Sequence, residues 1–307
     1  MGTPGRPASR SPAEEAPHAH LGPRPVPAPR GPPHPRLRRP PGPRPGTAGA
    51  ADRPLRIADL GCGPGNSTRL LTERWPEARI TGYDHSEAML ARARTDLADT
   101  DADFAHADLT TWTPDEPYDL IASNATLQWV PGHQHRLADW TAALTPGGTL
   151  AFQVPGNFDA PSHALMRRLA ASEGPWGERL AGALRGADAV LDPAGYLPYL
   201  AGPGRTTDLW ETTYLHLLNG PDAVLDWVTG TGLRPVLDAL ADDPAARTAF
   251  TDAYRDLLRK AYPATGDGTT PFPFRRVFAV VTVPTTAPAG QEAAGSPQEF
   301  PEPDPQA

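Results

Sequence analysis

The sequence predicts an α/β fold with a doubly wound, mostly parallel sheet and helices on both faces. Along the middle of the 307-residue chain, short apolar runs of strand length alternate with segments of helical periodicity, the pattern of successive βαβ units. A glycine-rich turn follows the first run, and an acidic or amide side chain follows or closes each of the next three. The predicted globular part covers residues 55–283, an ordinary size for one α/β domain.

The individual elements follow from local patterns. Strands are expected over 55–60, 79–84, 102–107, 118–123 and 149–154, each a short apolar run. Helices are expected over 67–75, 86–97 and 127–144, where apolar residues recur at helical spacing. Ser86 is the expected N-cap of the second helix, and Pro146–Gly148 the expected turn before the fifth strand. Residues 155–205 are interpreted as a helical insertion with Gly and Pro breaks, which forms a lid over the site.

The glycine-rich turn predicts a binding site for a nucleoside-bearing cofactor. The first apolar run ends at Asp59 and then breaks into Gly61, Gly63 and Gly65. Glycine permits a tight turn and lets another molecule approach the backbone closely. Asp84 closes the next strand, where a carboxylate can accept hydrogen bonds from both hydroxyls of a ribose. The cofactor is therefore expected at the carboxyl ends of the parallel strands.

The spacing of the turn narrows the kind of cofactor. A dinucleotide fingerprint is G-x-G-x-x-G, but Asn66 stands where its third glycine belongs. No Lys-Ser or Lys-Thr pair follows, so a phosphate-cradling P-loop is not supported. The D-x-G-x-G-x-G pattern that begins at Asp59 resembles class I S-adenosylmethionine-dependent methyltransferases. This resemblance implies a Rossmann-like fold, in which the aspartate faces the amino-acid end of the cofactor and the glycines pass beneath its ribose.

Polar residues at further strand ends extend the predicted site. Asp108 follows the third strand, where a carboxylate can accept a hydrogen bond from the exocyclic amine of adenine. Asn124 and Ala125 follow the fourth strand, beside the expected place of the sulfonium. A lone Asp or Asn there is commonly a helix cap, but four successive strand ends favour a shared site. The expected cofactor-binding residues are Asp59, Gly61, Gly63, Gly65, Asn66, Asp84, Asp108, Asn124 and Ala125.

Longer runs resemble one narrower family, the trans-aconitate 2-methyltransferases. The resemblance covers roughly residues 55–283. The runs are DLGCGPGNST (59–68), ITGYDHSEAML (80–90), SNATLQWVP (123–131), WETTYLHLL (210–218), DWVTGTGLRP (226–235) and FRRVFAVV (274–281). The resemblance implies an antiparallel last strand, S-adenosyl-L-methionine as cofactor, and a small tricarboxylic acid that becomes a mono-methyl ester.

The implied chemistry depends on positioning. A carboxylate has a pKa of about 4 and is ionised at neutral pH, so it attacks the methyl group without a general base. We therefore expect no catalytic residue in the strict sense. Cationic contacts to the carboxylates that do not react are expected instead, preferably from Arg side chains.

Candidates for these acceptor contacts lie mostly after the fifth strand. Arg234 lies in a glycine-containing loop, and Arg276 precedes the last apolar run. Tyr214 and His216 alternate on a predicted strand, so both should point to one face. Gln128, with Trp129 beside it, follows the fourth strand and could form a wall near the methyl group. Each of these residues also has an ordinary alternative, solvation for Arg and packing for the others.

Metal and disulfide chemistry are not expected. His133 and His135 have metal-like spacing, but no Cys or third His lies near them in sequence, so we interpret them as surface residues. The single cysteine, Cys62, allows no intramolecular disulfide and suits a reducing cytoplasm. No apolar run is long enough for a signal peptide or a membrane span, and a cytoplasmic monomer is expected.

The two ends of the chain have a different composition. Residues 1–54 and 284–307 contain most of the 40 prolines and are predicted to be disordered. The first segment carries nine Arg and three acidic residues, but it has no aromatic residue to stack on bases, so no nucleic-acid partner is expected. Members of the resembled family usually begin with an aromatic-containing helix that closes over the cofactor. The head is therefore interpreted as a gene-model error or a divergent arm, with weaker cofactor binding as the consequence.

Three functions remain open from the sequence. The first is a carboxylate O-methyltransferase acting on trans-aconitate or a close relative. The second is a methyltransferase with another small acceptor, and the third is a cofactor-binding protein that has lost catalysis. Arg234 and Arg276 facing the sulfonium would favour the first, because a neutral acceptor needs no cationic contacts.

Overall fold

The computed structural model describes residues 53–285, and its elements follow the predicted alternation of strands and helices. The predictions for the two ends of the chain lie almost wholly outside the described residues. The strands are β1 (Arg56–Leu60), β2 (Arg79–Asp84), β3 (Asp103–His106), β4 (Tyr118–Asn124), β5 (Leu144–Pro155), β6 (Thr206–Asn219) and β7 (Thr269–Thr282). The helices are α1 (Asn66–Arg74), α2 (Glu87–Asp96), α3 (Leu137–Ala142), α4 (Pro161–Ala170), α5 (Pro193–Leu200), α6 (Ala223–Thr229), α7 (Arg234–Ala239) and α8 (Pro244–Ala261).

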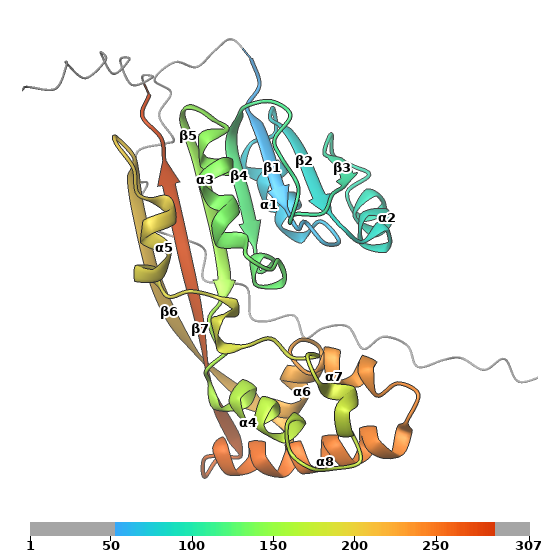
Figure 1. Cartoon of the computed structure of the whole chain (residues 1–307). Coiled ribbons are helices and arrows are strands. Elements are labelled where there is room, and N and C mark those ends of the chain that lie inside the picture. The colour runs from blue at the N-terminus through green and yellow to red at the C-terminus, as the bar shows by residue number, and fades with distance from the viewer. Residues whose placement is uncertain (1–52, 286–307) are drawn as a thin grey trace, which may run out of the picture. The chain divides into compact units, whose positions relative to one another are not determined.

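The seven strands form one sheet in the order β3-β2-β1-β4-β5-β7-β6 (Figure 1). The first five strands are parallel to one another, and β7 runs antiparallel to both β5 and β6. This confirms the predicted sheet and its antiparallel last strand. The strand order reverses between β1 and β4, and ligands of such sheets bind at the carboxyl ends beside that reversal.

Helices cover both faces of the parallel strands. On one face, α3 and α5 bury Trp140 and Tyr196 in a cluster that includes Ala58 of β1. Successive strand residues point to opposite faces, so the neighbouring Ile57 points away from this cluster. Ile57 and its strand partner Ile80 are also buried, and α1 and α2 pack against β2. This confirms the doubly wound arrangement.

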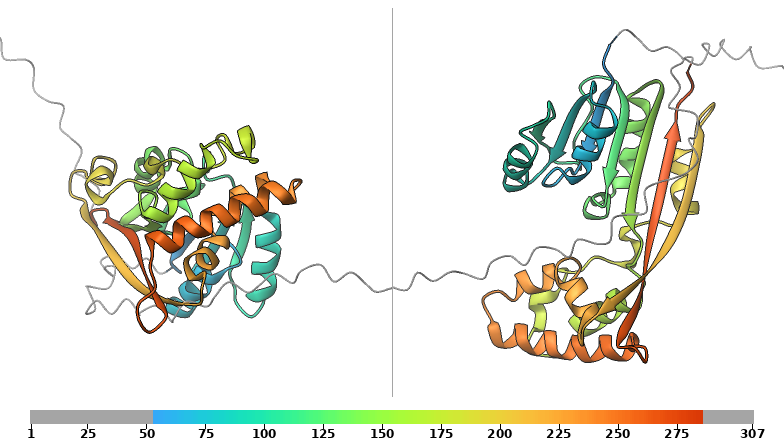
Figure 2. Two further views of the ribbon diagram at one scale, coloured as in Figure 1. Left: turned by 90° about the horizontal axis from the view of Figure 1, so that it is seen from below. Right: turned by 180° about the vertical axis from the view of Figure 1, so that it is seen from behind.

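A second core lies around the extended ends of β6 and β7. These two strands have 14 residues each, and the helices α4, α6, α7 and α8 gather at one end of the pair (Figures 1 and 2). Phe250 and Tyr254 of α8 pack there with Phe272 of β7. The segment 155–205 contributes to both cores, because α4 belongs to the helical group and α5 to the sheet.

Two local predictions are wrong. The helix expected over 127–144 is divided into two 3₁₀ turns and the six-residue α3, because Pro131 and the left-handed Gly132 interrupt it. His133 is not a surface residue but 2% exposed, with its Nε2 atom 2.7 Å from the hydroxyl of Tyr196, whereas His135 is exposed as expected.

The start of β5 differs from the prediction by a few residues. The strand β5 begins at Leu144, so the expected turn at Pro146–Gly148 lies inside it as an irregularity of the ladder. Between residues 53 and 285, no helix is both long enough and apolar enough to cross a membrane.

Candidate functional site

Asp59 lies at the carboxyl end of β1 and is completely buried. Its Oδ2 atom accepts hydrogen bonds from Ser67 Oγ at 2.8 Å and Thr68 Oγ1 at 2.7 Å, both in the first turn of α1. Its Oδ1 atom has no hydrogen-bond partner among the described residues. Burial raises the pKa of Asp59, although the two hydroxyl groups oppose this rise. A buried carboxylate oxygen with spare capacity suits a cationic group such as the ammonium of an amino acid.

The three glycines of the turn have different surroundings. Gly61, Gly63 and Gly65 all have positive φ angles, of 72°, 54° and 88°, which glycine adopts without strain. A side chain at Gly61 would collide with Thr126, whereas one at Gly63 would meet nothing within 4 Å. Packing therefore explains the glycine at position 61, and Gly63 borders space that a ligand can use.

Asp84 is held against this open part of the turn. Its Oδ2 atom accepts a hydrogen bond from Gly63 N, and its Oδ1 atom accepts one from Ser86 N, each at 2.9 Å. A carboxylate has about four lone-pair sites, so both oxygens can still accept from a ligand. Ser86 also caps α2 as predicted, with its Oγ atom accepting from Met89 N. The turn and the carboxylate thus form a rigid cradle.

Asp108 follows β3, and Asn66 begins α1; both are exposed near the same edge of the sheet. The Oδ1 atom of Asp108 accepts from the amide and hydroxyl groups of Thr110 at 2.9 and 2.7 Å, and these hydrogen bonds lower the pKa of Asp108. The carboxylate therefore remains an anionic acceptor at neutral pH.

The turn after β4 has an unusual backbone. Ala125 has a φ angle of 54°, the one positive value at a non-glycine residue between residues 53 and 285. Its amide donates to the carbonyl oxygen of Gln153 at 2.8 Å, while Asn124 beside it is exposed. Left-handed non-glycine residues often cluster at ligand sites, so the expected place of the sulfonium coincides with a constrained turn.

Two buried glutamines lie at the carboxyl ends of β4 and β5. Gln128 is 6% exposed; its Nε2 atom donates to Ala125 O at 2.6 Å, and its Oε1 atom has no partner among the described residues. Gln153 is 7% exposed; its Oε1 atom accepts from Arg276 Nη1 at 2.8 Å, and its Nε2 atom likewise has no partner. Buried amides are normally satisfied, so each of these free atoms leaves a hydrogen-bonding position for a ligand or a water molecule. Gln153 was not among the residues expected at the site from the sequence, although it is a polar residue in the apolar run of the fifth strand.

Arg276 is a partly buried cation at this end of β7. Burial lowers its pKa, and it forms no ion pair with any residue of the described part. Tyr214 and His216 lie on the neighbouring strand with their rings nearly parallel and 6.5 Å apart, which confirms that both point to one face. His216 also packs 4.7 Å from the ring of Trp227, so packing is part of its role.

Arg234 differs from Arg276. It is the first residue of α7, its side chain is 70% exposed, and it pairs with Asp238 at 3.4 Å one turn later. Within the described residues, Arg234 forms no hydrogen bond or ion pair with any of the other residues expected to contact the acceptor.

Arg185 is a cation that the sequence analysis did not single out. Its guanidinium lies over the ring of Trp129, 3.3 Å from the centroid, and its Nη1 atom donates to Gln128 O at 2.7 Å. The segment around Arg185 has no regular periodicity, so only spatial proximity reveals the contact. Arg185 and Arg276 are the two arginines of the described part whose pKa is lowered by burial.

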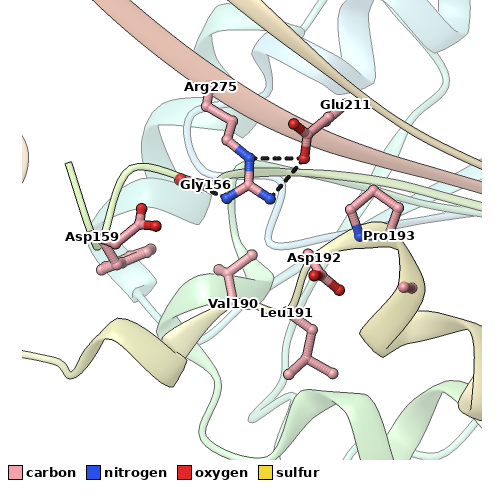
Figure 3. A pocket seen from close by; sticks show the side chains of 10 residues that line it. Gly156, Asp159, Val190, Leu191, Asp192, Pro193, Glu211 and Arg275 are labelled. Carbon is pink, nitrogen blue, oxygen red and sulfur yellow. Dashed lines mark hydrogen bonds and ion pairs between the residues drawn. The ribbon is translucent and has the colours of Figure 1, made fainter.

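An open pocket of about 850 Å³, lined in part by Phe158 and Arg275, lies where the end of β5 meets β6, β7 and the start of α5 (Figure 3). Its Arg275 is neutralised by Glu211, with Nη2 and Oε2 2.7 Å apart. Asp159 and Asp192 also line it, so carboxylates outnumber guanidinium groups. A polycarboxylate would be repelled there, and this pocket does not fit an anionic acceptor.

Comparison with known proteins agrees with the geometry. The methyltransferase domain family matches residues 57–148. A trans-aconitate 2-methyltransferase of Streptomyces coelicolor is 67% identical over 235 residues, which cover 75% of this chain and 77% of the relative. One of Streptomyces avermitilis is 64% identical over 231 residues, covering 74% and 84%. The chain belongs to the trans-aconitate 2-methyltransferase family.

A looser similarity connects this family member to a solved S-adenosylmethionine-dependent methyltransferase from Mesorhizobium loti. The two are 21% identical, with a TM-score of 0.39, over 75% of this chain and 91% of that one. Membership of the trans-aconitate 2-methyltransferase family and the matched methyltransferase domain make the chain a methyltransferase, and its cofactor is S-adenosyl-L-methionine. The free Oδ1 atom of Asp59 and the open side of Gly63 beside Asp84 fit this cofactor. Between residues 53 and 285, no three or more His, Cys, Asp or Glu side chains are arranged to hold a metal ion.

Proposed function

We propose that this chain transfers a methyl group from S-adenosyl-L-methionine to one carboxylate of trans-aconitate or a similar small tricarboxylic acid. The observation that carries the proposal is the pair formed by Arg276 and Gln153. The guanidinium is partly buried, has a neutral partner, and leaves the amide Nε2 of Gln153 free to donate. A partly buried cation without a counter-charge, beside a free donor, is a site for a carboxylate.

The residues of the parallel strands would hold the cofactor. We assign the ribose hydroxyls to Asp84, the ammonium to the Oδ1 atom of Asp59, and the adenine amine to Asp108. Gly63 would pass beneath the ribose, while Gly61, Gly65 and Asn66 shape the turn and the start of α1. The strained turn at Asn124 and Ala125 would border the sulfonium.

The reaction needs no proton transfer. When bound, S-adenosyl-L-methionine supplies an electrophilic methyl group. One C–S bond breaks and one C–O bond forms, so a carboxylate and a sulfonium become a neutral ester and a neutral thioether. Arg276 and Gln153 would orient the acid through a carboxylate that does not react. Gln128, Tyr214 and His216 would line the acceptor side, and Arg234, which is exposed, would contribute at most at the rim.

We propose a single methyltransferase domain over residues 55–283, in a cytoplasmic monomer. Residues 155–205 would cover the acceptor, with motion restricted to the part before α5, because Tyr196 and Leu200 are buried in the sheet core. Limited proteolysis with and without S-adenosylhomocysteine tests this cover. Equal cleavage rates within the segment would contradict it.

A radiolabelled methyl-transfer assay against a panel of di- and tricarboxylic acids tests the function. We expect a labelled, base-labile ester from trans-aconitate and weaker labelling of dicarboxylates. The R276Q variant should raise the KM of the acid on the order of tenfold while cofactor binding is retained. No labelled ester from any acid would refute the proposal.

A further inference from the structure

Arg185 is partly buried between aromatic side chains. Its guanidinium lies 3.3 Å from the centroid of the Trp129 ring and 5.3 Å from that of Phe158. Both distances lie within the range of cation–π contacts, and desolvation lowers the pKa of the guanidinium to about 10. The aromatic rings hold the planar group but do not neutralise it.

The positive charge of Arg185 is not compensated within the described residues. Its one hydrogen bond there goes to the carbonyl oxygen of Gln128, and no carboxylate lies within 4.0 Å. Arg275 provides the contrast, because Glu211 neutralises it at 2.7 Å. Arg185 and Arg167 both disfavour a proton on nearby His163 and help to lower the pKa of that ring to about 4. The charge of Asp159 acts on the same ring in the opposite sense, but Asp159 forms no ion pair with Arg185. A partly buried cation without an ion-pair partner gains from an anionic ligand.

Hydrogen bonds connect Arg185 to the same strand ends as Arg276. Arg185 donates to Gln128 O, and the side chain of Gln128 donates to Ala125 O. The amide of Ala125 donates to the main chain of Gln153, whose side chain accepts from Arg276. The two uncompensated arginines are thus anchored to the ends of β4 and β5.

We infer that Arg185 binds a second non-reacting carboxylate of the acceptor, and that the two arginines together select tricarboxylic over dicarboxylic acids. The inference rests on the proposed function. One carboxylate lies at Arg276 and Gln153, a second at Arg185, and the third remains loosely held and attacks the methyl group. A dicarboxylate would have to leave one arginine unpaired, at a cost in KM.

The test compares R185Q with R168Q in the otherwise unchanged full chain. Arg168 is exposed on α4, so its variant loses the same charge outside the site. In R185Q, the KM for trans-aconitate should rise on the order of tenfold or more, while the KM for S-adenosylmethionine changes less than about twofold. The preference for tricarboxylic over dicarboxylic acids should largely disappear. R168Q should behave like the wild-type protein.

A second variant at the same position keeps the test valid if R185Q does not fold. Should R185Q not fold, R185K decides, because lysine keeps the charge but lacks the planar fork that stacks on Trp129. The acid KM should still rise in R185K, with an unchanged KM for S-adenosylmethionine. Unchanged acid KM values in the folded variants, in an enzyme that methylates trans-aconitate, would overturn the inference and leave the proposed function intact.

Calorimetry distinguishes a failure of the Arg185 inference from a failure of the proposed function. Tricarballylate, which has three carboxylates, is titrated into the protein with S-adenosylhomocysteine present. Binding that is lost in R185Q and retained in R168Q supports the inference even where no acid is methylated, an outcome that would refute the proposed function alone. Equal binding by both variants would refute the role of Arg185.

Discussion

His163 makes the stability of this protein depend on pH in a defined window. The ring lies in α4, 5.4 Å from the ring of Phe158, with its Nε2 atom facing Gly232. Burial is the largest cause that lowers its pKa from 6.5 to about 4, the charges of Arg167 and Arg185 add to this effect, and Asp159 opposes it. Between these two pH values the unfolded chain binds a proton that the folded protein does not bind, so stability falls as the pH falls.

The size of the effect follows from the two pKa values. Each pKa unit corresponds to about 1.4 kcal/mol, so a drop from 6.5 to about 4 costs on the order of 3 kcal/mol once the pH is below both values. The contribution is fully present above pH 6.5 and decreases as the pH falls toward 4. At pH 4.5, the free energy of unfolding should have lost about 2 kcal/mol through this group.

Urea unfolding at pH 7 and pH 4.5 measures the loss. The wild-type protein should lose about 2 kcal/mol more than H163Q between the two pH values, since glutamine binds no proton there. H135Q is the matched control, because His135 is exposed, and it should lose as much as the wild-type protein. An equal loss in wild type and H163Q would refute the reasoning.

Further predictions concern the cofactor turn. Burial beside Asp59 and Asp84 raises the pKa of the Cys62 thiol to about 12, so a thiol reagent at pH 8 should label the native protein far more slowly than the urea-unfolded chain; equal rates would contradict this. G61A should lower the free energy of unfolding by about 3 kcal/mol, because the new methyl group collides with Thr126, and G63A by about 1 kcal/mol, for the positive φ alone. Urea unfolding measures both, and equal losses would argue against the difference in packing. D84N should weaken the binding of S-adenosylhomocysteine on the order of tenfold in calorimetry, with little change in melting temperature; unchanged affinity would remove Asp84 from the site.

Local sequence patterns predicted the structure correctly wherever the contacts that determine it join residues close in sequence. The cap of α2 joins Ser86 to Met89, three positions away, and the glycine turn follows its strand directly. The alternation of Tyr214 and His216 predicts a shared face, since the pleat of a strand has a period of two residues. The predicted helix over 127–144 failed because Gly132 begins a new turn within an otherwise helical pattern.

The residues on the acceptor side could not be predicted in this way, because contacts between distant parts of the chain bring them together. Arg276 and Gln153 are 123 positions apart, and Arg185 and Gln128 are 57 apart. His133 is buried because Tyr196, 63 positions later, reaches its ring. No sequence window contains both members of these pairs, so neither spacing nor periodicity can indicate them.

The sequence by itself determined the sheet, the turn and the cofactor, because a strand, its glycines and the next strand's carboxylate are neighbours along the chain. It also indicated the family. Only the tertiary structure decided which arginines lack a counter-charge: Arg234 is exposed and paired, whereas Arg185 and Arg276 are desolvated beside neutral partners. Desolvation depends on everything packed around a group, and that environment exists only after strands distant in sequence have come together.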